Sequence, residues 1–527
     1  MKYKFLFATL FASLLVTSCD IVSPSQGNTS SQTIEEYDHE LKYRTYYQIL
    51  VYSFADSNGD GIGDFKGIAD KAPYLKELGV EGLYLSPIHP ANAYHGYDVT
   101  DYYGVRSIYE VDGYTFEQLV EDMKALDIVI LIDLVVNHSS VNHLWFYEAQ
   151  DAYSRDEENK YITWYNFSKT QDAKHPWGST SRYYEGIFSS SMPDFNFDNP
   201  EVREEFIKIG KFWMEKGIAG FRLDAAMHIF TDYSGGDKWN GDILSKNAEF
   251  WTEFQSAIAE DYPNFYMVGE VWTAQPKLES YYSTNIDSLF NFDHVTRAQG
   301  QLFGTASLAV GFDTHQRNIR LRQEDAIEAN FLSNHDKPRL STSLSNQSIL
   351  KMLGTMTILA PGNSFIYYGE EVGLRAVGSS SIADRVYRTP MPWSDAYLTD
   401  SARYGNGANL TSTTVSSLSP QAQLADPTSL FIYYQQAIRL KREHFELRAG
   451  TVGVVNSFSP VVSVHTMTYE GVTKMVIHNG SSSSYTFNSP INIGDIIDGI
   501  SVSWATATRN GNTLNVPPYS STIVAIP

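Results

Sequence analysis

The chain has 527 residues, a hydrophobic content of 43% and a mean hydropathy of −0.27, values typical of a globular protein with more than one domain. Its 39 basic and 61 acidic side chains give a formal net charge of −22, so its surface repels nucleic acid and anionic lipid headgroups. We therefore expect a neutral partner and no nucleic acid. The aromatic content of 14% is compatible with sugar binding but equally with a large core.

The N-terminus has the pattern of an export signal. Lys2 and Lys4 precede an apolar run over 5–16 that is too short to span a bilayer. The only cysteine, Cys19, follows this run, as in bacterial lipoprotein signals, where a lipid is attached to the cysteine after cleavage. We predict a signal peptide over 1–18, lipid attachment at Cys19 and an exported protein anchored to the cell envelope or cell surface. An ordinary secretory signal with an incidental cysteine is the alternative.

Alternating apolar and amphipathic segments follow a Ser-, Thr- and Gln-rich stretch over 19–36, which predicts a flexible tether. The repeated alternation predicts an α/β fold, a (β/α)8 TIM barrel over 37–138 and 196–425. Its clearest helix starts with Asn199 as N-cap and Pro200, and ends before Gly217. The predicted strands are 46–54, 80–88, 128–136, 218–225, 265–272, 288–292, 328–333 and 364–368.

Two segments lie outside the predicted barrel. Residues 139–195 are rich in Tyr, Trp, Ser and Asp and lack clear helical periodicity, which predicts an irregular inserted subdomain after the third strand. Beyond a predicted helix over 429–444, alternating segments are separated by Gly, Asn and Ser. This pattern predicts a C-terminal antiparallel β-sandwich domain over 426–527.

Polar side chains gather at the carboxyl ends of five predicted strands, which meet at one mouth in a barrel of this kind. Three carboxylates with His and Arg beside them suit cleavage of a glycosidic bond, because one carboxylate attacks the anomeric carbon while a carboxylic acid protonates the leaving oxygen. We expect Arg222 to keep Asp224 ionised by lowering its pKa. A buried ion-pair network is the structural alternative. In strand order, the residues are His95 and Asp98, Asn137 and His138, Arg222 and Asp224, Glu270, and His335 and Asp336.

At these residues the chain resembles the α-amylase family of glycoside hydrolases. The resemblance implies retaining hydrolysis of α-1,4 bonds in starch or maltodextrins, with Asp224 as nucleophile, Glu270 as general acid and base, and Asp336 orienting the sugar. Ala225, directly after the nucleophile, is the residue type that accompanies α-1,4 bonds in the family. The matching segments, in the family's order, are 133–138, 192–196, 220–228, 269–272, 331–336 and 368–371.

The resemblance also implies a set of substrate-binding side chains. Tyr97 would stack on the sugar, and Arg388 would pair with Asp98 in the same subsite. A plain loop position is the alternative for His95, and Asp133 is interpreted as a structural aspartate inside the barrel. The full set is Tyr97, His95, Asp98, His138, Arg222, His335 and Arg388.

A loop after the first strand carries oxygen donors at alternate positions, as in the first part of an EF-hand calcium loop. Gly67 replaces the bidentate Glu of an EF-hand, so the loop is not expected to be one. Similar loops bind calcium in the family, and a solvated acidic turn is the alternative. The predicted calcium ligands are Asp56, Asn58, Asp60, the carbonyl of Ile62, and Asp64.

A second calcium site is implied by the resemblance alone. Asn137, Asp194 and the carbonyl of His228 match the site that joins barrel and insertion in α-amylases. Met227 stands where the family often has a lysine, which puts a substrate contact there in doubt.

Other functions stay open at this point. Within the family these are an oligo-1,6-glucosidase, an α-glucosidase or a maltodextrin transglycosylase. A glycan-binding protein without activity is a further alternative, although such relatives usually lose one of the three carboxylates that this chain keeps. We expect the protein to act as a monomer.

Overall fold

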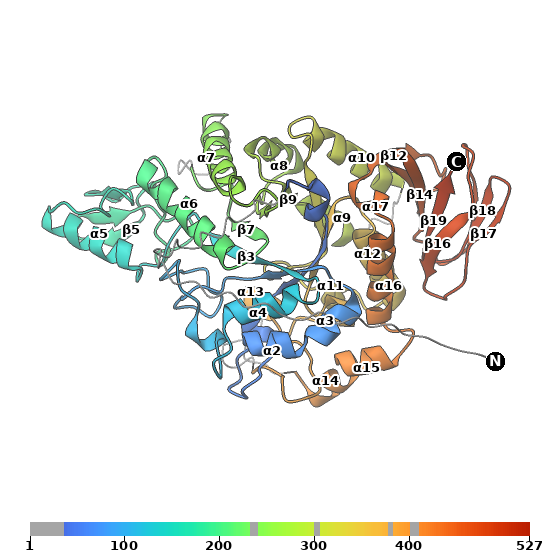
Figure 1. Cartoon of the computed structure of the whole chain (residues 1–527), viewed down its shortest axis with the longest axis horizontal. Helices are drawn as coiled ribbons and strands as arrows, with labels where there is room; N and C mark the ends of the chain where they lie inside the picture. Colours follow the sequence, from blue (N-terminus) through green and yellow to red (C-terminus); the bar gives the residue numbers. More distant parts are fainter. Residues whose placement is uncertain (1–35, 232–240, 300–305, 378–382, 401–409) are drawn as a thin grey trace, which may run out of the picture.

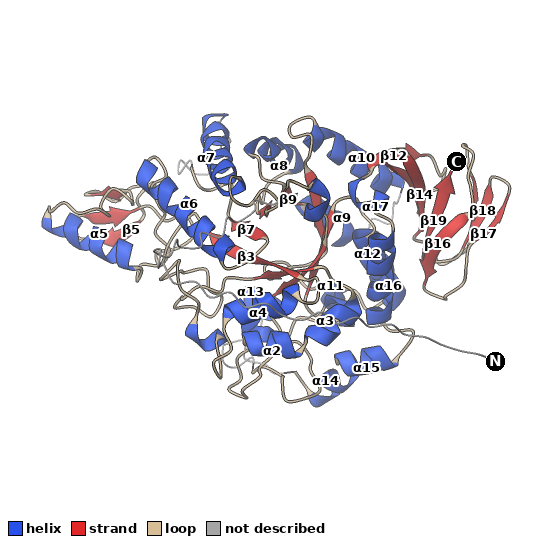
Figure 2. Ribbon diagram, in the orientation of Figure 1, coloured by secondary structure: helices blue, strands red, loops and turns tan. Residues whose placement is uncertain are grey.

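The structure is a computed structural model and describes residues 36–231, 241–299, 306–377, 383–400 and 410–527. Eight parallel strands form a closed barrel in the order β1-β11-β10-β9-β8-β7-β3-β2 (Figures 1 and 2). The order follows the chain once around the barrel, which confirms the predicted fold. The strands are β1 (Thr45–Ile49), β2 (Gly82–Leu85), β3 (Val129–Val135), β7 (Gly220–Asp224), β8 (Tyr266–Gly269), β9 (Ser288–Phe290), β10 (Ile327–Phe331) and β11 (Asn363–Tyr367).

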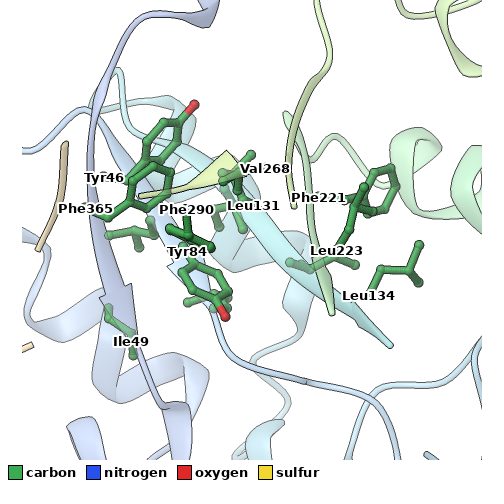
Figure 3. Close-up of a cluster of buried hydrophobic side chains, with 14 of the residues drawn as sticks. Tyr46, Ile49, Tyr84, Leu131, Leu134, Phe221, Leu223, Val268, Phe290 and Phe365 are labelled. Carbon is green, nitrogen blue, oxygen red and sulfur yellow. The ribbon is translucent and has the colours of Figure 1, made fainter. Parts of the chain in front are cut away.

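Aromatic rings fill the part of the barrel interior below the mouth (Figure 3). Tyr46 stacks on Phe365 with ring centroids 4.9 Å apart, and Phe290 meets Phe365 edge-on at 4.9 Å. Gly82 leaves room for this packing, because a Cβ there would lie 2.5 Å from the ring of Tyr46. The interior is therefore a packed core rather than a channel, and polar side chains are confined to its carboxyl end.

Helices cover the outside of the barrel (Figure 2). The predicted helix is α6 (Pro200–Glu215), in which the side chain of Asn199 accepts the amide of Glu201. None of the described helices combines the length and the apolar composition needed to cross a membrane. The other helices outside the insertion are α1 (Val51–Phe54), α2 (Phe65–Asp70), α3 (Ala72–Leu78), α4 (Phe116–Lys124), α7 (Gly241–Ala259), α8 (Gln275–Ser280), α9 (Phe292–Gln299), α10 (Ala306–Arg320), α11 (Leu340–Ser343), α12 (Gln347–Ile358), α13 (Ala383–Tyr387), α14 (Ser412–Leu418), α15 (Pro420–Ala425), α16 (Leu430–Glu443) and α17 (Glu446–Ala449).

The first predicted strand is too long at its carboxyl end. The ladder of β1 ends at Ile49, and the apolar residues that follow form α1 instead. All four residues of α1 are buried, so a buried helical turn and a buried strand have the same apolar composition here.

The insertion is more regular than predicted. It contains α5 (Leu144–Arg155), which buries Trp145, Phe146, Ala149 and Ala152 on one face, a helical spacing that the sequence reading missed. A small sheet of order β4-β6-β5 completes it, and the insertion projects from the barrel at the left of Figure 1. Its strands are β4 (Phe167–Ser168), β5 (Trp177–Ser179) and β6 (Arg182–Tyr184).

Antiparallel sheets follow the barrel at the C-terminus, as predicted (right of Figure 1). A five-stranded sheet of order β12-β13-β14-β19-β16 and a three-stranded sheet of order β15-β18-β17 share a buried apolar cluster. Helix α16 contributes Leu430, Phe431 and Ala437 to the core of the barrel instead. The strands are β12 (Thr451–Val455), β13 (Val462–Tyr469), β14 (Val472–Asn479), β15 (Tyr485–Asn488), β16 (Ile496–Ser501), β17 (Thr508–Asn510), β18 (Thr513–Val516) and β19 (Ser520–Ile526).

The predicted signal peptide and Cys19 fall outside the described residues, as does the predicted tether up to residue 35. Export and lipid attachment therefore stay predictions.

A buried ion pair fastens the start of the chain to the barrel. Lys42 precedes β1, and its Nζ lies 2.7 Å from Oδ1 of Asp287, just before β9; both side chains are almost fully buried. We expect Lys42→Met to lower the free energy of unfolding by about 3–5 kcal/mol, because Asp287 would be left as an unpaired buried charge. Urea unfolding followed by tryptophan fluorescence measures this change.

The matched control is Lys66→Met. Lys66 pairs with Asp70 one helical turn away, and both side chains are substantially exposed. Its loss should cost less than about 1 kcal/mol. Equal losses of unfolding free energy in the two variants would show that the buried pair of Lys42 and Asp287 stabilises the fold no more than the exposed pair does.

Candidate active site

A single buried guanidinium gathers three carboxylates at the mouth of the barrel. Nη1 of Arg222 lies 2.8 Å from Oδ1 of Asp133 and 2.6 Å from Oδ1 of Asp224, and Nη2 lies 2.9 Å from Oε2 of Glu270. Arg222 is 1% exposed. The structure therefore brings together Arg222, Asp224 and Glu270, which lie up to 48 positions apart in the printed sequence.

Strand register explains this meeting. In the ladders, Asp133 of β3 lies beside Arg222 of β7, and Leu223 lies beside Gly269 of β8. Asp224 and Glu270 therefore leave neighbouring strands at the same height. Ala225 then takes a left-handed conformation with φ of 47°, and its amide donates to Oε2 of Glu270 at 3.4 Å. The turn after Asp224 is thus tied to the second carboxylate.

The pKa of Asp224 differs from our expectation. Burial raises it well above its usual range, and the carboxylates of Asp133 and Glu270 act in the same direction. Arg222 does lower the pKa of Asp224, as predicted, but this effect is smaller than that of burial. One guanidinium cannot balance three ionised carboxylates, so the cluster favours holding a proton.

The third predicted carboxylate, Asp336, has partners of its own. Its Oδ2 lies 2.9 Å from Nε2 of His335, and its Oδ1 lies 2.8 Å from Nη2 of Arg388. Burial alone would raise the pKa of Asp336, but His335, Arg388 and Arg222 together hold it well below its usual range. Asp336 is thus ionised and fixed in orientation.

Tyr97 connects the two groups of charges. Its hydroxyl donates to Oδ2 of Asp133 at 2.8 Å and lies 2.6 Å from Nε2 of His335. Gln48 donates to Nδ1 of His335 at 2.8 Å, which places the ring proton on Nε2, between the hydroxyl oxygen of Tyr97 and Oδ2 of Asp336. A continuous set of polar contacts therefore runs from Asp224 to Asp336, and the three carboxylates lie at the same mouth of the barrel.

The other predicted substrate-binding residues lie around Tyr97. His138 Nε2 lies 3.2 Å from the carbonyl oxygen of Tyr97, and burial lowers the pKa of His138 to about 4, so its ring is neutral. His95 Nδ1 accepts the amide of Tyr97 at 3.1 Å. The ring of Tyr97 stacks on His335 with centroids 5.4 Å apart. Stacking of Tyr97 on a sugar stays a prediction.

The expected pair between Arg388 and Asp98 is replaced by other contacts. Arg388 binds Asp336, as described above, and its Nη1 donates to the hydroxyl of Tyr94 at 2.8 Å. Both carboxylate oxygens of Asp98 accept the amide of Ala93, at 3.0 and 3.1 Å. Asp98 thus stabilises the loop that contains it. This contact with a backbone amide could not be predicted from the sequence.

Sequence reasoning also missed several residues of this region. Gln48 ends an apolar strand and carried a weak signal, whereas Tyr84 looked like core although its hydroxyl donates to Asp133 at 2.7 Å. Lys337, next to Asp336, places its Nζ 4.0 Å from the ring of Trp272, which is half exposed. A lysine and a tryptophan therefore lie close to the carboxylates as well.

The loop predicted to bind calcium holds two buried carboxylates, Asp56 and Asp64. In this structure they accept backbone amides, such as that of Gly61 on Asp56 and that of Gly67 on Asp64, at 2.7 and 2.6 Å. Burial raises the pKa of Asp64, and the Asp56 carboxylate adds to this rise, as expected where a nearby cation would be favourable. Asp56 and Asp64 suit calcium by chemistry and burial, whereas the other two predicted side-chain ligands, Asn58 and Asp60, are exposed.

The described residues contain no group of three or more His, Cys, Asp or Glu side chains placed to hold a metal ion. A calcium site in this loop would thus depend on Asn58 and the Ile62 carbonyl as well. At the second predicted site, Asn137 Nδ2 donates to the carbonyl of His228 at 2.7 Å, and Oδ2 of Asp194 accepts the amide of Ile187 at 3.0 Å. Both calcium sites stay predictions.

The chain is similar to known proteins over the segment that contains these residues. Residues 48–450 match the model of the alpha amylase catalytic domain. Alpha-amylase 3 of Dictyoglomus thermophilum is 34% identical over 502 residues, covering 92% of this chain and 94% of that protein. An oligo-1,6-glucosidase of Parageobacillus thermoglucosidasius is 29% identical over 532 residues, covering 86% and 92%. The solved structure of Eubacterium rectale Amy13B superposes with a TM-score of 0.81 at 30% identity, over 93% of this chain and 96% of that one.

The buried histidine of the site predicts a pH dependence of stability. The pKa of His138 is about 4 in the folded chain and about 6.5 when unfolded. The unfolded state therefore binds the extra proton first as the pH falls, so His138 costs stability between about pH 6.5 and 4. We expect His138→Gln to flatten the fall of the melting temperature in this window, as measured by calorimetry. An unchanged slope would show that the ring is protonated in the folded state.

Proposed function

Because the chain belongs to the alpha-amylase family of glycoside hydrolases, we propose that it is a retaining, endo-acting hydrolase of α-1,4-glucans such as starch or maltodextrins. One observation carries the proposal: Asp224 and Glu270 bind the same guanidinium of Arg222, at 2.6 and 2.9 Å. This shared contact favours a separation near the roughly 5–5.5 Å of retaining enzymes over the roughly 6.5–9.5 Å of inverting ones.

Burial favours a proton on Asp224 in the free site, so the reacting form of the site is the one in which Asp224 is ionised. In this form Glu270 carries the proton. It donates this proton to the glycosidic oxygen while Asp224 attacks the anomeric carbon, which forms a covalent glycosyl-enzyme and releases the shortened glucan. Glu270, now ionised, takes a proton from water, and the water oxygen displaces Asp224 from the anomeric carbon. Arg222 bridges both carboxylates and so stabilises whichever of them is ionised.

Asp336 acts beside the reacting pair rather than in the transfer itself. Its contacts with His335 and Arg388 fix an ionised carboxylate at the mouth of the barrel, where the side chain is 30% exposed. Such a group can accept hydrogen bonds from sugar hydroxyls and favour the distorted ring of the transition state. The sugar in the cleaved subsite would then be held by Tyr97, by His138 and by the ion pair of Asp336 with Arg388.

Fewer observations bear on which glycosidic bond, α-1,4 or α-1,6, the enzyme cleaves. Ala225, directly after Asp224, supports α-1,4 bonds by the resemblance described above. The similarity to a protein named oligo-1,6-glucosidase favours a second candidate, an exo-acting enzyme for α-1,6 bonds in short substrates. A maltodextrin transglycosylase would use the same carboxylates, with a sugar hydroxyl replacing water in the second step.

We also propose that the protein is exported and held at the cell envelope by a lipid on Cys19. Asn264, just before β8, donates to the carbonyl of Glu36 at 2.9 Å and accepts the amide of Asp38 at 2.7 Å. The described chain therefore begins at the amino-terminal face of the barrel, opposite the mouth. A lipid anchor attached before Glu36 would leave the mouth free to meet a polymer.

Calcium in the loop from Asp56 to Asp64 is a further part of the proposal. A bound ion would neutralise the two buried carboxylates and stabilise the loop. The loop is itself attached to a later segment, because the Asp56 amide donates to the carbonyl of Tyr397 and the Asp400 amide donates to that of Gly61. Its role would thus be structural.

We expect reducing-sugar release from soluble starch and maltotriose to exceed release from isomaltose and pullulan. Glu270→Gln should lower kcat by at least about 100-fold because the leaving oxygen is no longer protonated, and Asp224→Ala should lower it further. The control is Asp127→Asn, an exposed turn residue with φ of 58° that Asn tolerates. Preferred cleavage of isomaltose would support the oligo-1,6-glucosidase, and disproportionation of maltotriose the transglycosylase. Full activity of either carboxylate variant would refute the assigned roles.

Calcium removal should lower the melting temperature. EDTA should destabilise the protein by several degrees, with recovery on adding calcium, because Asp56 and Asp64 would again face each other without a cation. Asp56→Asn should remove this dependence, and Asp127→Asn should keep it. Calorimetry with and without EDTA tests the metal independently of activity, and equal melting temperatures in both conditions would count against it.

A further inference from the structure

Three bulky aromatic residues have a backbone conformation that they rarely adopt. Among the described residues, the aromatic ones with a left-handed backbone are Phe458, Trp504 and Tyr519, with φ of 55°, 56° and 42°. This conformation costs free energy for a residue with a large side chain, whereas glycine and asparagine adopt it readily. Strain of this kind persists where the position of the side chain matters.

All three residues lie at one end of the five-stranded C-terminal sheet. In the ladders, Val462 lies beside Asn479, Asn479 beside Ser520, and Ser520 beside Ser501. The loops that leave the sheet at these positions are 456–461, 480–484, 502–507 and 517–519. We call this set of loops the aromatic loop end.

Two of the rings face solvent. Phe458 is 80% exposed, and Trp504 is 43% exposed while one side of its indole packs against Tyr433, with ring centroids 5.4 Å apart. The Trp504 amide donates to the carbonyl of Ser501 at 3.0 Å, which fixes the turn that presents the indole. Two exposed aromatic rings at one end of a sheet, both at strained backbone positions, are more than the scattered apolar residues found on most surfaces.

Trp504 also borders a groove of about 270 Å³. Among the described residues that line it, Asp498 is the only charged one, and its Oδ2 is paired with Arg439 at 3.0 Å. Of the lining hydroxyl residues, Thr506 is exposed, whereas Ser501 and Thr522 are buried and the Ser501 hydroxyl donates to the carbonyl of Ala505. The groove is therefore neutral, partly polar and bordered by a flat apolar surface.

These properties match a sugar chain. A pyranose ring presents a face of C–H groups, which can stack on an indole, and a rim of uncharged hydroxyls, which can bond with serine and threonine. A charged ligand would find no unpaired charge in the groove, and this chain carries a large negative net charge.

We infer that the aromatic loop end is a second, non-catalytic binding site for an α-glucan chain, with Trp504 as its main stacking surface. The identity of the glucan rests on the proposed function. The site lies on the C-terminal sheets, across the barrel core from the insertion (Figure 1). It would hold a polymer near the enzyme while the mouth acts on another part of the chain.

The experiment compares binding and catalysis in the full chain. In a Glu270→Gln background, which does not consume the ligand, we expect Trp504→Asn to lower the fraction bound to insoluble starch at least fivefold. With Glu270 intact, the same substitution should leave kcat/KM for maltotriose unchanged and reduce it only for insoluble starch. The melting temperature should not fall, because Asn suits the left-handed backbone.

Two further variants define the site. Phe458→Asn should weaken binding in the same direction, whereas Tyr147→Ala, an exposed aromatic residue on α5 with ordinary helical backbone, should not. Starch binding equal to that of the parent in Trp504→Asn would overturn the inference, and so would a lower melting temperature with binding retained.

The two proposals fail in different ways. If the parent hydrolyses maltotriose but its Glu270→Gln form binds neither starch nor glycogen, the second site is wrong and the proposed function stands. If the parent hydrolyses only α-1,6 substrates and binds dextran through Trp504, the proposed linkage is wrong and the second site stands with another glucan.

Discussion

The mouth of the barrel depends on one buried cation. Arg222 contacts Asp133, Asp224 and Glu270, and its burial means that these charges are balanced by one another rather than by water. Three ionised acids and one base leave an excess of negative charge, so the cluster favours retaining a proton. Acid catalysis of glycoside cleavage needs such a retained proton, and nucleophilic attack needs an ionised neighbour. The excess of carboxyl groups over cations would therefore provide both a protonated and an ionised carboxyl group in one cluster.

The barrel can hold this charged cluster because its interior is divided into an apolar layer and a polar layer. Tyr46, Phe290 and Phe365 fill the interior below the mouth, and Tyr84 marks the border, since its ring lies 6.4 Å from that of Phe290 while its hydroxyl reaches Asp133. Below this level the rings are almost fully buried. Above it, Tyr97 and His335 extend the polar contacts from Asp133 to Asp336.

The sequence was sufficient for the parts that follow from strand order. Eight strands and the residues at their carboxyl ends could be predicted, because parallel strands bring those ends to one mouth. The partners of individual side chains could not: Arg388 binds Asp336 although Asp98 was expected, since the Ala93 amide already occupies Asp98. Burial was also missed as the dominant effect on the pKa of Asp224, because the depth of a residue depends on packing around it. Helix α5 was missed for a different reason, as its apolar face lies within a segment dominated by aromatic residues.

Backbone strain links the mouth to the distant aromatic loop end. At Ala225 the left-handed turn directs an amide at Glu270 just after Asp224, and its small side chain keeps the cost low. At Trp504 the same conformation carries the largest side chain available, where glycine would avoid the cost and the fold would still close. The difference separates two uses of strain. In the first, the main chain makes the contact. In the second the side chain does, since the indole of Trp504 packs against Tyr433 on one side and is 43% exposed.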